Sequence, residues 1–319
     1  MADSTTHSPA PVMPPFAGSD ARQVPYDQAR VAVLPAPYEG TVSYGGGASH
    51  GPGAILAASE QLEMYDEELD VEIDSVGLFT LPPALPFPLP SPSTSANALN
   101  PEQAVAAIKA AAWAPLRDGK WLLTLGGEHS VTVGVLQALL EARDGKPFSI
   151  LQVDAHADLR QSYGGTPLSH ACVMARAHDL GLPFVQVGIR ALCSEERAFI
   201  RQKGLEGNVF WDHQLVVSHA NRWIGEVVER LGNMGEEVYI TFDLDGLDPA
   251  IMPATGTPVP GGLSWHMATR LLRAVGQSHK VIGADITELA PMTGLHAPDF
   301  LAARLAFKLI GYSLLSQAE

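Results

Sequence analysis

Acidic residues and histidines gather directly after two short apolar runs of this 319-residue chain. Asp154, His156 and Asp158 follow one run, and Asp243 and Asp245 follow another. In an extended chain, residues two apart point to the same side, so each group aims its side chains into one space. Buried carboxylates must be paired with cations or must bind a metal. The two groups therefore predict a metal site.

A second histidine completes the predicted ligand set. It lies in the motif GGEHS, which follows a third apolar run. The set is then His129, Asp154, His156, Asp158, Asp243 and Asp245. Six ligands exceed the four of a tetrahedral zinc site, and none of them is a cysteine. Oxygen ligands with two imidazoles suit two five- or six-coordinate cations, with manganese the first choice. Two such cations can lower the pKa of a shared water molecule and so supply a nucleophile at neutral pH.

The apolar runs are predicted strands, and amphipathic segments between them are predicted helices. Strands are expected at Val31–Leu34, Ser75–Phe79, Trp121–Leu125, Phe148–Val153, Val185–Ile189, Val209–Trp211, Val238–Phe242 and Val281–Ile286. Helices are expected at Gly53–Tyr65, Pro101–Trp113, Val131–Arg143, His170–Asp179, Ser194–Gln202, Asn221–Leu231, His266–Val275 and Pro298–Leu314. Alternating strands and helices favour an α/β fold with a mostly parallel sheet between two helical layers. Ligands bind beyond the carboxyl ends of such strands, which is where the acids and histidines lie.

The rest of the chain predicts one domain with one tail. Residues 1–23 are polar and rich in proline, which predicts a flexible N-terminal tail, and residues 24–319 form the domain. The segment Leu81–Asn100 is crowded with proline and serine and predicts a long surface loop. The loop ends at Asn100-Pro101, an N-cap followed by proline at the first helical position.

Composition narrows the class of function. The formal net charge is -15, which disfavours nucleic acid and anionic membranes as partners and suits a small cationic substrate. No apolar run is long enough to span a membrane. The N-terminus lacks the pattern of a signal peptide, so we expect a cytoplasmic protein. Two cysteines do not make a disulfide framework.

Five segments together resemble one enzyme family, the ureohydrolases, which comprise arginases and agmatinases. The segments are GGEHS (126–130), DAHADLR (154–160), SHACVMARA (169–177), FDLDGLDPAIMPATGTPVPGGL (242–263) and DITELAP (285–291). The resemblance runs from about Pro25 to the end of the chain. The stretch at 37–69, PYEGTVSYGGGASHGPGAILAASEQLEMYDEEL, is similar to the agmatinase branch.

The resemblance implies a single-domain, three-layer αβα fold with an eight-stranded sheet and two Mn²⁺ ions per chain. By it, one ion is bound by His129, Asp154, Asp158 and Asp243, and the other by Asp154, His156, Asp243 and Asp245. It also assigns a proton shuttle to His170 and the acid that pairs with the substrate guanidinium to Glu288. Glu128 stands where many members have aspartate, and no loss of metal is expected from this. Homotrimers or homohexamers are expected by resemblance alone.

The expected reaction is the hydrolysis of agmatine to putrescine and urea. The loop at 159–170 differs from the polar loop of arginases, which disfavours arginine as the substrate. N1-aminopropylagmatine is the first alternative, and guanidinobutyrate and guanidinopropionate are further ones because Arg160 could hold a carboxylate. In the mechanism, Asp158 holds the attacking hydroxide in line, and His170, with a pKa near neutrality, protonates the leaving amine.

Two other classes of function share parts of this pattern. A pseudoenzyme that binds a ligand on the same fold would have lost metal ligands, yet all six are present. A metal deacetylase or phosphatase also uses carboxylate-rich sites, but it does not account for Glu288 or for the matching segments.

Overall fold

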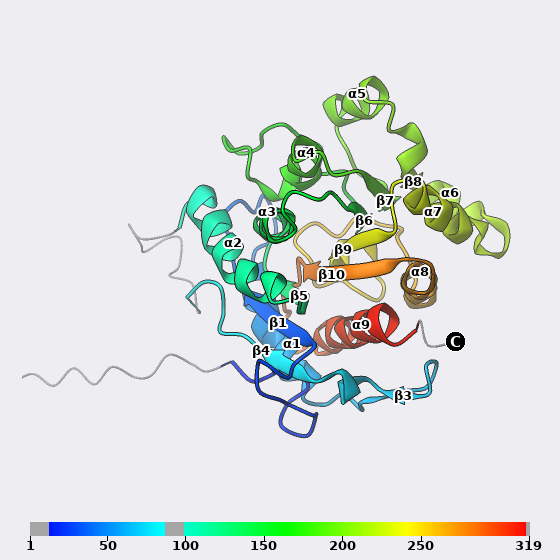
Figure 1. Ribbon diagram of the computed structural model, residues 1–319. Coiled ribbons are helices and arrows are strands. Elements are labelled where there is room, and N and C mark those ends of the chain that lie inside the picture. Colours follow the sequence, from blue (N-terminus) through cyan, green and yellow to red (C-terminus); the bar gives the residue numbers. More distant parts are fainter. Residues whose placement is uncertain (1–12, 87–98, 317–319) are drawn as a thin grey trace, which may run out of the picture.

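Eight strands form one central sheet in the computed structural model, which describes residues 13–86 and 99–316 (Figure 1). Across the sheet the strands are β4 (Leu78–Thr80), β1 (Val31–Ala36), β5 (Trp121–Gly126), β10 (Lys280–Thr287), β9 (Glu237–Asp243), β6 (Ser149–Val153), β7 (Phe184–Ile189) and β8 (Val209–Trp211). All pairings between these strands are parallel. The predicted α/β fold and its eight strands are confirmed.

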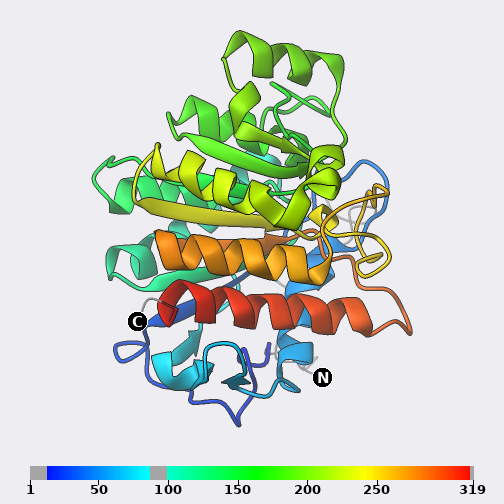
Figure 2. The ribbon, with the colours of Figure 1, turned by 90° about the vertical axis from the view of Figure 1, so that its right-hand side faces the viewer.

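Helices cover both faces of this sheet, and an apolar core fills the space between each helical layer and the strands (Figures 1 and 2). One layer contains α1 (Gly51–Ser59), α6 (Asp212–Val217), α7 (Arg222–Gly232), α8 (Trp265–Ser278) and α9 (Ala297–Leu314). The other contains α2 (Pro101–Arg117), α3 (Val131–Ala142), α4 (Val173–Asp179) and α5 (Ser194–Gln202). Because strands such as β1 and β5 are buried along their whole length, they appear in the sequence as unbroken apolar runs.

The helix boundaries differ from the predicted ones where local pairing or capping decides them. Helix α1 ends at Ser59, six residues before the predicted end, because Tyr65–Asp66 (β2) pairs with Val71–Glu72 (β3) in a small hairpin. Helix α2 begins at Pro101 as predicted, and the side chain of Asn100 accepts a hydrogen bond from Gln103 N. It continues through Pro115 to Arg117, four residues beyond the predicted end. Helix α6 was not predicted.

The predicted tail and the predicted loop fall partly outside the described residues. Residues 1–12 and 87–98 lie outside them, so the flexibility of the tail and most of the loop stay predictions. Residues 13–23 do not extend away from the domain. Phe16 and Ala17 are buried, and their backbone N–H groups donate to Thr80 Oγ1 at 2.9 Å and to Ser59 Oγ at 2.8 Å. These contacts hold the segment against β4 and α1.

The carboxyl ends of four adjacent strands, β5, β10, β9 and β6, meet at one edge of the sheet. The register places Asp243 of β9 beside Thr287 of β10, so the residues that follow these strands are neighbours in space. This edge therefore collects the acids and histidines singled out in the sequence. No helix in the described ranges is long and apolar enough to cross a membrane.

Candidate active site

A cavity of about 190 Å³ opens at this edge of the sheet. Its walls come from the loop after β1, from the segments that follow β5, β6, β9 and β10, and from the loop that follows Asp245. The lining residues are Val42, Ser43, Tyr44, Gly45, His129, His156, Asp158, Arg160, Tyr163, His170, Ala171, Asp243, Asp245, Gly256, Thr257 and Glu288. Two of the loops are joined where Gly45 N donates to Gly256 O at 3.1 Å. In Figure 2 they are the blue and the yellow loops on the right.

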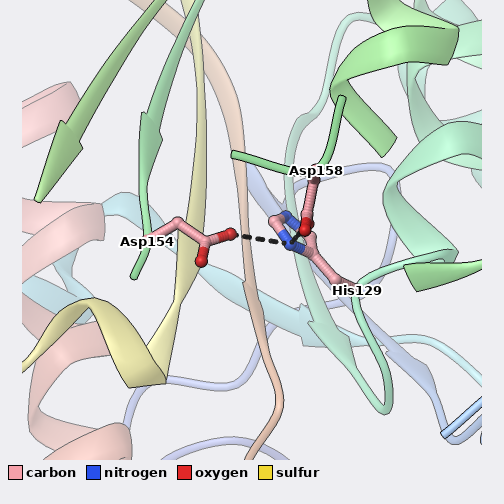
Figure 3. A group of neighbouring side chains, drawn as sticks. All are labelled: His129, Asp154 and Asp158. Atoms are coloured by element: carbon pink, nitrogen blue, oxygen red, sulfur yellow. Dashed lines mark ion pairs between the residues drawn. The ribbon is translucent and has the colours of Figure 1, made fainter. Parts of the chain in front are cut away.

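Five of the six predicted ligands line this cavity, and the sixth, Asp154, lies directly behind them at the end of β6. The first group of ligand atoms surrounds His129 Nδ1 (Figure 3). Asp158 Oδ2 lies 2.9 Å from it, Asp154 Oδ2 3.1 Å and Asp243 Oδ2 3.4 Å. Ligands on one small divalent cation, with bonds of about 2.0–2.1 Å, lie roughly 3 Å apart. The observed separations therefore match a set of atoms that share one ion.

The second group of ligand atoms uses Asp154 again. His156 Nδ1 lies 2.9 Å from Asp245 Oδ2 and 3.6 Å from Asp154 Oδ1. Backbone N–H groups fix the carboxylates: Asp245 Oδ1 accepts from Ala155 N at 3.0 Å, and Asp243 Oδ1 accepts from Asp245 N at 2.9 Å. Since Asp154 belongs to both groups, the arrangement is that of two neighbouring ion sites with a shared carboxylate.

The charges of this cluster fit two divalent cations. Burial, reinforced by the charges of Asp245 and Asp154, raises the pKa of Asp243 well above its usual range. Burial and the charge of Asp154 likewise raise the pKa of Asp158 to about 7. Among the described residues that line the cavity, Arg160 is the one lysine or arginine; the other positive charge beside these carboxylates comes from His129 and His156, whose pKa values the carboxylates raise when no metal is bound. Metal ions would remove this repulsion and keep the carboxylates ionised.

The two acidic residues with proposed catalytic roles have a left-handed backbone conformation, as do four other non-glycine residues of the described chain. Asp158 has a φ of 51° and Glu288 a φ of 68°, values that residues other than glycine adopt only uncommonly. The carbonyl of Asp158 accepts from Met174 N and Ala175 N in the first turn of α4, which holds the residue in place. Strain of this kind persists where the surrounding structure enforces it, commonly at functional sites.

Glu288 follows β10 and reaches the cavity beside His129. Its Oε1 accepts a hydrogen bond from His129 N at 2.7 Å, and its own backbone N donates to Gly127 O at 2.8 Å. Position 127 requires glycine, because a Cβ there would lie 2.0 Å from Tyr38 O. Burial, together with the charge of Glu128, raises the pKa of the Glu288 carboxyl to about 8. A cationic substrate beside this carboxyl would favour its ionised form.

His170 lines the cavity opposite these acids, in the 3₁₀ turn that precedes α4. Its Nδ1 lies 3.0 Å from Thr41 Oγ1, and its ring packs edge-on against Tyr163 with centroids 5.8 Å apart. Burial lowers the pKa of His170 to about 4. The sequence predicted a pKa near neutrality, whereas partial burial, reinforced by the charges of His129 and His156, lowers the pKa in the structure.

A buried carboxylate that was not among the predicted site residues supports the first ligand group. Asp285 lies inside β10 and is fully buried; its Oδ1 accepts from the Thr241 hydroxyl and its Oδ2 from the Tyr239 hydroxyl, each at 2.7 Å. Thr241 Oγ1 in turn lies 2.8 Å from His129 Nε2. Because Thr241 donates to Asp285, it accepts from Nε2–H, and the Nδ1 lone pair of His129 then faces the other ligands. An acid within an apolar strand was the visible sign of this support.

Replacing Asp285 by asparagine should weaken metal binding by roughly 10- to 100-fold, because the tautomer of His129 would no longer be fixed. Isothermal titration of the metal-free protein with Mn²⁺ measures this directly. Tyr239→Phe is the matched control, since it removes one donor to Asp285 but keeps the link to Thr241. An unchanged Kd in Asp285→Asn would contradict the role of this carboxylate.

Comparison with known proteins identifies the family of the chain. The model of the arginase family matches residues 29–311. The chain belongs to the arginase family. It is 40% identical over 288 residues to the N(1)-aminopropylagmatine ureohydrolase of Synechocystis sp., with 90% of each chain covered. It is 32% identical over 281 residues to the agmatinase of Pyrococcus horikoshii, with 88% of this chain and 91% of that one covered.

A solved structure agrees with these sequence matches. The agmatine ureohydrolase of Thermoplasma volcanium has a TM-score of 0.79 and 29% sequence identity to this chain, with 95% of this chain and 94% of that one covered. The predicted membership in the agmatinase branch of the ureohydrolases is therefore confirmed, and this arginase-family protein is a hydrolase that acts on the C–N bonds of amidines. The cluster around His129 and Asp154 is its binuclear metal site.

Proposed function

We propose that this arginase-family enzyme releases urea from a guanidino-terminated polyamine, with N1-aminopropylagmatine as the first substrate and agmatine as the second. The observation that carries the proposal is the paired ligand groups that share Asp154, with the carboxyl of Glu288 beside them. The order of the two substrates differs from the sequence-based expectation. It follows the Synechocystis relative at 40% identity, whereas the agmatinase of Pyrococcus is 32% identical.

Two Mn²⁺ ions are the proposed cofactors. His129, Asp154, Asp158 and Asp243 would hold one ion, and Asp154, His156, Asp243 and Asp245 the other. A thiol-free set of carboxylates and imidazoles supports manganese. When bound, such a pair lowers the pKa of a water molecule so that it can attack at neutral pH.

The roles of the surrounding side chains follow from their positions. Glu288 pairs with the substrate guanidinium in a planar, two-bond geometry. Asp158 accepts a hydrogen bond from the attacking water and directs it at the guanidinium carbon. His170, neutral in its enclosed position, takes a proton from that water and gives it to the leaving amine.

The mouth of the cavity supports a cationic tail. Tyr44 is 86% exposed there, and Tyr163 lines the same opening. An alkylammonium tail can lie against such rings at a gain of about 0.5–1 kcal/mol at an exposed site. Arg160 also lines the cavity, with its guanidinium 4.9 Å from the ring centroid of Tyr163. Its positive charge is the feature that favours a guanidino acid, whose carboxylate it could bind.

A substrate panel tests the proposal. Purified protein with Mn²⁺ is assayed for urea release from N1-aminopropylagmatine, agmatine, 4-guanidinobutyrate and arginine. We expect kcat/KM to be highest for N1-aminopropylagmatine, lower for agmatine and lowest for the two substrates with carboxylates. The highest kcat/KM with 4-guanidinobutyrate would transfer the role of tail recognition to Arg160 and refute the polyamine assignment.

Assembly into a homotrimer or homohexamer stays a prediction from the sequence. A molar mass from light scattering at assay concentration measures it, and a monomeric mass would contradict it.

A further inference from the structure

Glu128, next to the ligand His129, holds the loop that carries one wall of the cavity. Its carboxylate is fully buried and receives four hydrogen bonds. Oε2 accepts from the backbone N–H groups of Gly40 at 2.8 Å and Thr41 at 2.7 Å. Oε1 accepts from the hydroxyls of Thr41 at 2.7 Å and Ser130 at 2.5 Å. Each carboxylate oxygen of Glu128 therefore accepts two hydrogen bonds, Oε2 from backbone N–H groups and Oε1 from hydroxyls.

The hydroxyl of Thr41 connects this carboxylate to His170. Thr41 Oγ1 accepts from His170 N at 3.1 Å and lies 3.0 Å from His170 Nδ1. A hydroxyl has one proton to donate and two lone pairs that accept. Since the Thr41 proton goes to Glu128, both lone pairs accept from His170, so the proton of the neutral ring is on Nδ1. The Ser169 hydroxyl lies farther from Nδ1, at 3.4 Å.

A proton on Nδ1 determines what the other ring nitrogen of His170, Nε2, can do. His170 lines the cavity, and with Nδ1 engaged by Thr41, Nε2 is the nitrogen that remains for the substrate. In this tautomer Nε2 has a lone pair and can accept a proton. Burial lowers the pKa of His170, which is consistent with a neutral ring whose tautomer decides what it can do.

We propose that Glu128 and Thr41 are positioning residues that fix His170 in its Nδ1–H tautomer, so that Nε2 carries the proton in urea release. The inference rests on the proposed function. The water loses one proton to Nε2 as its oxygen bonds to the guanidinium carbon. The bond between the guanidinium carbon and the nitrogen that carries the alkyl chain then breaks. Its electron pair stays on that nitrogen, which takes the proton from Nε2. The second water proton also ends on the amine, leaving neutral urea and an alkylammonium.

Glu128→Gln should reverse the direction of the hydrogen bonds that link Glu128, Thr41 and His170, while the side chains keep their positions. Two backbone N–H groups point at Oε2, so the amide oxygen of glutamine must occupy that position. Its NH₂ group then occupies the Oε1 position and donates to Thr41 Oγ1. The Thr41 hydroxyl is left to donate its own proton to His170 Nδ1, which places the ring proton on Nε2. The cavity-facing nitrogen can then no longer accept a proton.

A double-mutant cycle tests whether Glu128 acts through His170. Kinetics are measured for wild type, Glu128→Gln, His170→Asn and the double variant, with metal content determined for each. We expect Glu128→Gln to lower kcat by roughly 100- to 1,000-fold, within the ~10²–10⁴-fold range of a proton-transfer group, with KM and metal content retained. Placed on His170→Asn, it should cause little further loss, because the residue through which it acts is already absent.

Glu39→Gln is the matched control on the same loop. Glu39 accepts from Gly47 N and Ser49 N and does not contact His170. A loop defect alone should lower kcat by the same factor in wild type and in His170→Asn. A conservative pair completes the set: Thr41→Val should repeat the loss of kcat, and Thr41→Ser, which keeps the hydroxyl, should recover most of it.

An activity-independent measurement separates this inference from the proposed function. Protein labelled with ¹⁵N-histidine and loaded with diamagnetic Mg²⁺ is examined by NMR, with His170→Asn to identify the His170 signals. Nδ1 should be the protonated nitrogen in wild type and Nε2 in Glu128→Gln. Protonated Nε2 in wild type, or equal losses of kcat in both backgrounds of the cycle, would overturn the inference. A protein with the expected tautomer but no urea release from any guanidino compound would refute the proposed function alone.

Discussion

Asp154→Asn is expected to leave the protein folded but unable to hold both metal ions. Asp154 belongs to both ligand groups, with Oδ2 3.1 Å from His129 Nδ1 and Oδ1 3.6 Å from His156 Nδ1. Asparagine keeps the shape but replaces one oxygen by NH₂, which cannot bind a cation, and removes the negative charge. The loss of metal affinity should exceed the roughly 10- to 100-fold that follows removal of a residue merely supporting a ligand.

The rate of urea release by Asp154→Asn should fall together with its metal content. A bound cation contributes several kcal/mol to such a reaction, and about 4 kcal/mol corresponds to roughly a thousandfold in kcat. Elemental analysis after gel filtration, together with urea release at saturating Mn²⁺, measures both effects. Asp248→Asn is the matched control, because the side chain of Asp248 accepts from Ala250 N in a turn on the same segment and belongs to neither ligand group. Two tightly bound ions and normal kcat in Asp154→Asn would refute the shared-ligand arrangement.

Glu288→Gln should lower kcat/KM steeply while both metal ions stay bound. Glu288 Oε1 accepts from His129 N, so the oxygen of glutamine is held at that position. The NH₂ group must then face the N–H groups of the substrate guanidinium, and attraction is replaced by donor-to-donor repulsion. Loss of one partner of a buried, hydrogen-bonded charge pair costs about 2–5 kcal/mol, or roughly 30- to several-thousand-fold in kcat/KM.

The measurement is kcat/KM for the best substrate of the panel, with metal content determined in the same preparation. Asp285→Asn is the comparison, because it should weaken metal binding, and its activity should recover when Mn²⁺ is raised to saturation. Excess Mn²⁺ should not restore Glu288→Gln. An unchanged kcat/KM, or full recovery with added Mn²⁺, would show that Glu288 does not bind the guanidinium.

Local patterns in the sequence were sufficient for the fold class and for the place of the predicted ligands at one edge of the sheet. Strands such as β6 and β9 are buried on both faces, so each is a short apolar run that needs no partner to be recognised. The ligands follow these runs at spacings of two residues, and parallel strands must bring their carboxyl ends to one edge. The sequence therefore determined that Asp154 and Asp243 would meet, although they are 89 positions apart in the chain.

Other features depend on contacts between segments that are far apart and carry no local pattern. Thr41 lies 129 residues from His170 and 87 from Glu128, and nothing in the sequence around it marks a link between them. The same holds for Thr241 and His129, 112 residues apart. Single hydroxyls are common in any chain, and only the folded arrangement decides which of them bridge a carboxylate to a histidine.

The protonation of His170 is the clearest case in which tertiary structure decided the chemistry. Its position after a glycine-rich loop was visible in the sequence, but its environment was not. The fold places the ring against Thr41 and Tyr163, and its partial burial lowers the pKa and favours the neutral form. Residue types and spacing determined which groups meet at the sheet edge, because strand direction is a local property. Burial and hydrogen-bond direction determine which proton each group carries, and these exist only once the chain has closed around the site.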